Sequence, residues 1–135
     1  MKTLEFGRHT LTYNDDGVSV MVYRGRVTYE EMAQILASED LSNVPPVVLV
    51  IADLRELTEI DSDARRLGAT SPKPAQRYYT AYVGASLALQ LIVSVWNRAA
   101  NLLHGKKYTA RFFDDHASGH AWLLAERAAF ERGQR

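Results

Sequence analysis

The stretch that decides the fold is residues 79–123, which read YTAYVG (79–84), ASLALQLIVSVWNRAANLLHG (85–105), KKYTARFF (106–113) and DDHASGHAWL (114–123). β-Branched and aromatic residues dominate the first and third pieces and predict strands, whereas the second and fourth pieces have helical patterns. Parallel strands cannot be joined by a tight turn, so strands alternating with helices predict a sheet with crossover helices.

The composition fits one globular domain over residues 1–135, with 47% apolar residues available for a core. Sixteen Lys and Arg balance sixteen Asp and Glu, so the chain has no bulk field to attract nucleic acid or anionic lipid. The absence of cysteine excludes disulfides, thiolate metal sites and cysteine nucleophiles.

No apolar run is long enough for a membrane segment. The longest, Leu87–Trp96, is interrupted by Gln90 and Ser94 and falls short of the ~20 residues that a span needs. Residues 1–6 also lack the apolar run of a signal peptide. We therefore expect a cytoplasmic protein without an integral membrane segment.

The first third of the chain predicts a hairpin followed by a helix. Two β-rich runs, Leu11–Tyr13 and Val18–Tyr23, flank an Asp-Gly pair, which is a strong signal for a tight turn. Thr28 and Glu31 have the spacing of a capping box and mark the start of a helix that ends before the prolines at 45–46.

The middle of the chain predicts the central strand. Residues Val47–Ala52 are apolar at every position, which is typical of a strand covered on both faces, and we expect this strand to end in Asp53. A short helix over residues 60–67 follows, with Asp61 as its cap. The predicted order is ββ-αβ-αβ-αβ-α: a single α/β domain with a mixed sheet, one antiparallel hairpin and four helices.

Three segments in this order resemble a known family: Val48–Leu54, Ala81–Ser86, and Phe112–Asp115 followed by Ala121–Leu123. The chain resembles the STAS-like, or SpoIIAA-like, family, and within it the bacterial branch labelled STAS/SEC14 domain-containing. The resemblance runs from the hairpin to about residue 127 and implies the SpoIIAA-like fold.

The same resemblance implies a surface for a regulatory protein partner. In anti-sigma antagonists a serine or threonine after the central strand is phosphorylated to release the partner. The matching segment here is residues 60–64, in which Asp63 occupies the phosphoacceptor position. We therefore expect a partner or switch surface at Asp61, Ser62 and Asp63, with a fixed charge in place of one added by phosphorylation.

A second candidate site is the carboxyl end of the central strand, where α/β sheets place their ligands. Asp53 ends that strand, and Gly84 and Ser86 lead into the long helix, whose first N–H groups can hold an anion. The alternative is structural: Asp53 caps the turn at residues 54–55, and Ser86 caps the helix.

The histidines raise the question of a metal or a catalytic group. His116 and His120 are four apart on a helix, a spacing that can present two imidazoles to one metal. The sequence offers no third ligand beside them, so we expect two solvated side chains. His9 and His104 have no serine or carboxylate arrangement nearby in the sequence. We therefore predict no catalytic residues, no metal, no cofactor and no enzymatic activity.

The helix over residues 86–103 has more apolar surface than a helix on one sheet needs. One stripe is expected to face the sheet, and a second stripe is surplus. The first comprises Leu89, Ile92, Trp96, Ala99 and Leu103, and the second comprises Leu87, Leu91, Val95 and Leu102.

The surplus predicts either an interface with a second copy or the lining of an apolar cavity, unless flanking elements cover it. We assign that role to Leu87, Leu91, Val95, Trp96 and Leu102. The favoured function is a non-enzymatic regulatory or protein-interaction module that forms a homodimer. The alternative is a carrier of a small apolar ligand or lipid, a SEC14-like role.

Overall fold

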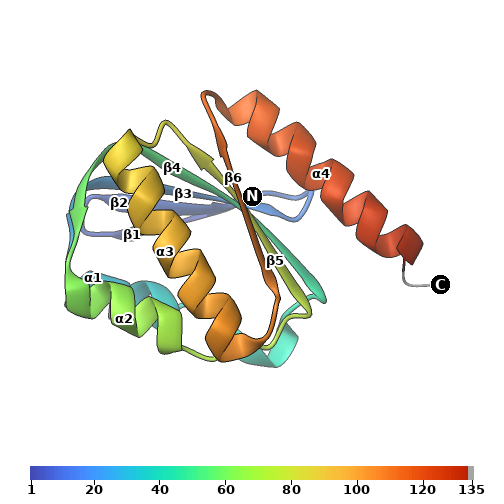
Figure 1. The fold of residues 1–135 in the computed structure, drawn as a ribbon, viewed down its shortest axis with the longest axis horizontal. Coiled ribbons are helices and arrows are strands. Elements are labelled where there is room, and N and C mark those ends of the chain that lie inside the picture. Colours follow the sequence, from blue (N-terminus) through green and yellow to red (C-terminus); the bar gives the residue numbers. More distant parts are fainter. Residues whose placement is uncertain (134–135) are drawn as a thin grey trace.

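The computed structural model of the protein describes residues 1–133, which form one six-stranded sheet with helices on both faces (Figure 1). The elements in chain order are β1 (Lys2–Phe6), β2 (His9–Tyr13), β3 (Val18–Val27), α1 (Tyr29–Ala37), the short 3-10 helix η1 (Leu41–Asn43), β4 (Val47–Ile60), α2 (Ser62–Thr70), β5 (Arg77–Val83), α3 (Leu87–His104), β6 (Tyr108–Phe113) and α4 (His116–Gly133).

The strands lie in the sheet in the order in which they occur in the chain. β1, β2 and β3 are antiparallel neighbours, and β3, β4, β5 and β6 are parallel. The predicted hairpin is the pair of β2 and β3, whose turn uses Gly17 with φ of +87°. The mixed α/β architecture expected from the sequence is therefore confirmed.

Two features of the sheet were not predicted. β1 was missed because its short alternation of Leu4 and Phe6 with polar residues is a weak strand signal beside the charged Lys2 and Glu5. The expected end of the central strand at Asp53 is wrong, since β4 continues to Ile60 alongside β3.

Irregular pairing explains why the second half of β4 was taken for a turn. The β3–β4 register shifts twice, and Thr58 is an extra residue between the pairs Gly25–Leu57 and Arg26–Glu59. Such bulges break the two-residue alternation by which a strand is recognised in a sequence.

The two faces of the sheet are covered differently (Figure 1). α4 alone packs over β4, β5 and β6, where Leu123 is fully buried against a cluster that also contains Val18, Val47, Leu49, Ile51, Ala81 and Val83. On the opposite face α1, α2 and α3 cover two further clusters, one around Leu54 and Val93 and one around Met21 and Ile35. β4 contributes to both sides, as its continuous apolar run predicted.

The predicted capping box is present and extends to a buried histidine. Thr28 Oγ1 accepts a hydrogen bond from Glu31 N, and Glu31 Oε1 accepts one from Thr28 N. His9 is fully buried, and its Nδ1 accepts from Arg24 N at 3.0 Å, so Nε2 carries the proton and donates to Glu31 Oε1 at 3.1 Å. The first hairpin is thereby tied to the start of α1.

Candidate functional site

The outer face of α3 carries a row of exposed large apolar side chains, which we call the α3 stripe: Leu87, Leu91, Val95 and Leu102. Their exposed fractions range from 67% for Val95 to 83% for Leu102. Leu103 beside them is also exposed. Flanking helices therefore leave this surplus apolar face uncovered in the single chain.

The inner face of α3 differs in phase from the expected one. Leu89, Val93 and Ala100 are buried, whereas Ala99 and Leu103, which were expected to face the sheet, are exposed. The buried positions are separated by four residues, from Leu89 to Val93, and by seven residues, from Val93 to Ala100. The row of α3 residues that meets the sheet is therefore adjacent to the predicted inner stripe and shares Leu89 with it.

Trp96 belongs to the packed side of α3. Its ring meets the ring of Tyr108 edge-on, with the centroids 5.6 Å apart, and its Nε1 lies near Gly68 of α2. It is half-buried, so Trp96 lies apart from the exposed α3 stripe with which it was grouped.

The expected switch surface lies at the start of α2. Ser62 and Asp63 are exposed, whereas the Asp61 carboxylate pairs with Arg26 through hydrogen bonds of 2.7 Å and 2.8 Å. The Arg26 guanidinium lowers the pKa of Asp61. Asp61 occupies the N-cap position, but its side chain makes no capping bond, because a strand residue far away in the sequence holds the carboxylate.

A hollow of about 580 Å³ joins the switch surface to α3. Its walls are the end of β4 (Thr58, Glu59 and Ile60), the start of α2 (Asp61, Ser62, Asp63 and Arg65) and the inner side of α3 (Leu89 and Ile92). Two sites that the sequence predicted separately are thus neighbours. Sequence reasoning missed Thr58, Glu59 and Arg65, since the extension of β4 that positions them was not predicted.

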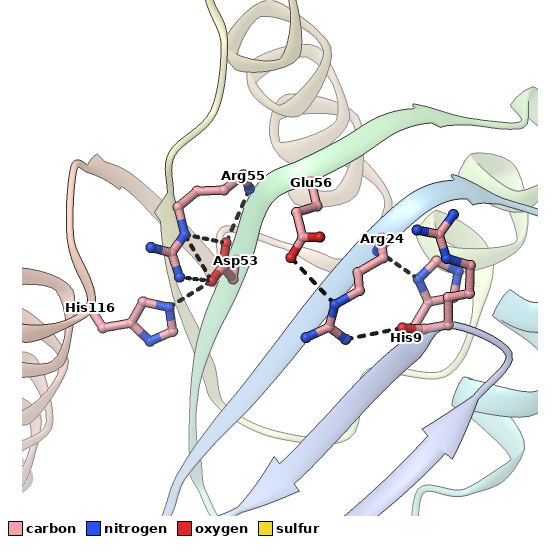
Figure 2. A network of polar contacts seen from close by, with 7 residues as sticks. His9, Arg24, Asp53, Arg55, Glu56 and His116 are labelled. Atoms are coloured by element: carbon pink, nitrogen blue, oxygen red, sulfur yellow. Dashed lines mark hydrogen bonds and ion pairs between the residues drawn. The ribbon is translucent and has the colours of Figure 1, made fainter.

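The middle of β4 holds a buried carboxylate, at the residue where the pairing with β5 ends (Figure 2). Asp53 is 3% exposed and accepts hydrogen bonds from Arg55 Nη2 at 2.7 Å and His116 Nε2 at 2.8 Å. Burial alone would raise the pKa of Asp53, but the hydrogen bonds from Arg55 and His116 outweigh it and lower the pKa to about 2.

Gly84 and Ser86, which were grouped with Asp53 in the sequence, both have structural roles. Gly84 has φ of +73°, and the stem of Arg55 occupies the space that a Cβ would need. Ser86 Oγ accepts from Leu89 N at 3.2 Å and caps α3. Arg55 N also donates to Asp53 Oδ1. Ser86 is therefore a helix cap, as its structural alternative expected, whereas no turn follows Asp53: residues 54–55 belong to β4, and Asp53 accepts from the N–H of a strand residue.

His116 and His120 bind different carboxylates. His116 reaches Asp53 on β4, and His120 Nε2 lies 2.7 Å from Asp16 Oδ2 in the β2–β3 turn. Both side chains therefore tie α4 to the sheet. Within residues 1–133 no group of three or more His, Asp or Glu side chains is placed to hold a metal ion.

A second hollow, of about 350 Å³, lies between the starts of α3 and α4 and includes Asp114, Asp115 and Ser118. Neither hollow includes Trp96, and both open to solvent. Among the helices of residues 1–133, none combines the length and apolar character that crossing a membrane requires.

Two solved structures are similar to the chain. An uncharacterized protein of the DUF3478 family with a SpoIIAA-like fold, from Shewanella loihica PV-4, is 21% identical, with 91% of this chain and 98% of that chain covered and a TM-score of 0.58. The anti-sigma factor antagonist SpoIIAA in its unphosphorylated form is 14% identical, with 93% and 97% covered and a TM-score of 0.50. The chain matches no protein-family model and no curated protein.

These similarities span nearly the whole of each chain and show that the protein has the SpoIIAA-like fold. The fold expected from the order of the three sequence segments is confirmed. At 21% and 14% identity the similarity concerns the fold alone.

Proposed function

We propose that this protein is a non-enzymatic protein-interaction module whose copies associate through the α3 stripe. The observation that supports the proposal is the exposure of four large apolar side chains on one face of one helix. Soluble monomers rarely leave such a contiguous apolar surface in water, and patches of this kind commonly mark protein interfaces.

The energy available from the stripe is comparable to the cost of association. Burying one leucine contributes about 1.5–3 kcal/mol, so eight such side chains from two copies contribute roughly 12 kcal/mol at the lower limit. Association costs roughly 4–15 kcal/mol in lost translational and rotational freedom. Because the two terms are close, one charged residue in the stripe should be enough to prevent dimerisation.

The geometry of α3 suits a two-fold contact. Its 18 residues span about 27 Å, and an antiparallel pairing would bring Leu87 of one copy against Leu102 of the other. Ser94 of one copy would then face Val95 of the other beside the two-fold axis. Small residues opposite large ones allow the ridges of one helix to fit the grooves of its partner.

Leu91→Glu tests the dimer directly. The wild type should sediment as a dimer at micromolar concentrations and Leu91→Glu as a folded monomer, because the interface would lose a buried leucine and would have to desolvate a carboxylate. The matched control is Leu41→Glu, the same change at an exposed leucine of η1, which should leave the dimer intact. A wild type that stays monomeric at high concentration in analytical ultracentrifugation contradicts the proposal.

The proposal includes a partner surface at Asp61, Ser62 and Asp63 that does not depend on phosphorylation. Asp63 is exposed and carries a permanent charge at the start of α2, where an added phosphate would otherwise supply one. Intact-mass measurement of the protein from its own cells should find no phosphate on Ser62. Stoichiometric phosphorylation of Ser62 would contradict the fixed-charge surface.

Native mass spectrometry separates the proposal from the carrier alternative in one measurement. A dimer without retained ligand is the expected result. A monomer that retains a fatty acid or lipid after purification would favour the carrier of a small apolar ligand instead.

A further inference from the structure

Over residues 54–60, one edge of β4 has no strand partner. Its pairing with β5 ends at Asp53, whereas its pairing with β3 continues to Ile60. Within residues 1–133, none of the backbone hydrogen bonds of loops, turns and caps involves residues 54–60, and the Arg55 N–H is taken by Asp53. At about 3.3 Å per residue, the part of this edge beyond Arg55, residues 56–60, is about 17 Å long.

The larger hollow borders the open edge. Thr58, Glu59 and Ile60 form one wall of it, and Leu89 and Ile92 of α3 form the opposite wall. An added strand lies about 4.7–4.9 Å from its neighbour, so a segment paired with the end of β4 would have to enter this hollow. The outer edges of β1 and β6 also lack a strand partner in residues 1–133, but no residue of either strand lines this hollow.

The hollow is acidic on the side of β4 and α2 and apolar on the side of α3. Three carboxylates, those of Glu59, Asp61 and Asp63, line it together with a single arginine, Arg65. Asp61 is paired with Arg26, whereas the structure records no ion pair for Glu59 or Asp63 within residues 1–133. Such an acidic side attracts Lys and Arg side chains and repels acidic ones.

We propose that the open edge of β4 accepts an extended, lysine- or arginine-bearing segment of a partner protein as an added strand. Main-chain hydrogen bonds to β4 would supply affinity, and alternate side chains would supply selectivity. Along such a strand one set of side chains faces Leu89 and Ile92, and the other set faces the carboxylates of Glu59 and Asp63.

A basic partner fits this edge better than a second copy of the chain. Two copies paired edge to edge would bring their own carboxylates together, and like charges opposite each other destabilise a strand pair. The two register shifts in the β3–β4 ladder also twist the edge away from a flat surface, which hinders indiscriminate pairing.

This proposal does not rest on association through the α3 stripe. The stripe lies on the outer face of α3, and the hollow lies on its inner face. A Leu91→Glu monomer should therefore bind the added strand as the wild type does, so that failure of the dimer and failure of the strand addition can be told apart.

The experiment uses labelled peptides of about eight residues, a length close to that of a typical strand. One peptide alternates lysine with valine, and its counterpart alternates glutamate with valine. Fluorescence anisotropy with the full chain should show binding of the lysine peptide and at least about tenfold weaker binding of the glutamate peptide, a difference that shrinks with added salt. Equal affinity for both peptides, or no binding of either, would overturn the proposal.

Backbone methylation tests whether the peptide forms a strand. One version of the lysine peptide is methylated on the nitrogens whose N–H groups point to one edge, and a second version is methylated on the nitrogens whose N–H groups point to the other edge. Each version therefore lacks the donors of one edge. Binding should be lost for the version methylated on the edge that faces β4 and retained for the other. Hydrogen exchange should slow within residues 54–60 on binding; protection elsewhere without protection there contradicts the site.

Charge reversal completes the test. The double variant Glu59→Lys with Asp63→Lys should reverse the preference toward the glutamate peptide. The control double variant, Glu30→Lys with Glu131→Lys, makes the same charge change at exposed positions on α1 and α4 and should leave the preference as it was. If the control reverses the preference equally, the net charge of the protein governs binding and the open edge does not.

Discussion

α3 and α4 are helices of 18 residues on opposite faces of one sheet, and their outer faces differ (Figure 1). α4 exposes alanines at Ala121, Ala125 and Ala129, spaced by four residues. α3 exposes leucines and a valine at the corresponding spacing along its outer face. Because small side chains suffice on the outside of α4, the fold does not require the large ones on the outside of α3.

The distribution of charged residues along the two helices supports the same conclusion. The second half of α4 carries Glu126, Arg127, Glu131 and Arg132, whereas Arg98 is the single Asp, Glu, Lys or Arg in α3. A helix on the surface of a soluble protein usually combines an apolar inner face with a charged outer face. α4 has exposed charges at Glu131 and Arg132 besides its exposed alanines, whereas the exposed face of α3 is made mainly of large apolar side chains, which is why we place the interaction surface on α3.

The largest expected effect is on the free energy of unfolding. It compares a buried leucine on the inner face of α4 with an exposed leucine on the outer face of α3. Leu123→Ala should lower the free energy of unfolding by about 2–5 kcal/mol, because a fully buried leucine leaves a cavity at the centre of the core. Urea unfolding followed by circular dichroism measures the change. The matched variant is Leu102→Ala, the same substitution at the most exposed position of the α3 stripe.

Leu102→Ala, measured in dilute protein, should stay within about 0.5 kcal/mol of the wild type, since it removes no packed side chain. A similar loss in both variants would mean that Leu102 is buried in the folded chain. The contrast between the outer faces of the two helices would then disappear.

Acid should weaken the attachment of α4. The pKa of Asp53 is lowered to about 2 in the folded protein by its bonds to Arg55 and His116, from an ordinary value of 3.8. A carboxyl whose pKa is depressed by folding stabilises the protein above its unfolded pKa, and that contribution is lost as the pH falls toward the folded pKa. The difference corresponds to about 2 kcal/mol, lost between pH about 4 and about 2.

The comparison for this prediction is Asp53→Asn, which keeps the size of the side chain and removes its charge. The stability difference between wild type and variant should be constant above pH about 4 and should narrow below it. A difference that does not change with pH over this range would show that the Asp53 charge is not what holds the start of α4.

Much of the architecture could be predicted from local patterns. The apolar run of β4, the capping box at Thr28 and Glu31, and the alternation of strands and helices after residue 77 each carry a signal within a few residues. The extension of β4 beyond Asp53 carries no such signal, because its bulges are set by pairing with β3 and hide the alternation.

The candidate surface could be predicted in part for a similar reason. The outer stripe of α3 follows from helical spacing, and all four of its residues are exposed. The inner stripe was misplaced, since the pattern does not say which of two adjacent apolar rows meets the sheet. The bond of Asp61 to Arg26 and the hollow beside it depend on tertiary contacts that sequence spacing cannot supply.

The smallest expected effect on folding comes from making the outside of α3 resemble the outside of α4. The triple variant Leu87→Ala, Leu91→Ala and Val95→Ala should change the free energy of unfolding of the monomer by no more than about 0.5 kcal/mol per site. Alanine favours a helix slightly more than leucine or valine does, which offsets the little packing that exposed side chains provide.

The same triple variant should nevertheless abolish association. For a dimer that dissociates on unfolding, the midpoint of urea denaturation rises with protein concentration, and for a monomer it does not. The wild type should show this rise and the triple variant should lack it, while the two midpoints should converge at the lowest concentrations. If the midpoints differ as much in dilute as in concentrated protein, the large side chains of α3 act within the chain, and the difference between the two helices has its origin in folding and not in binding.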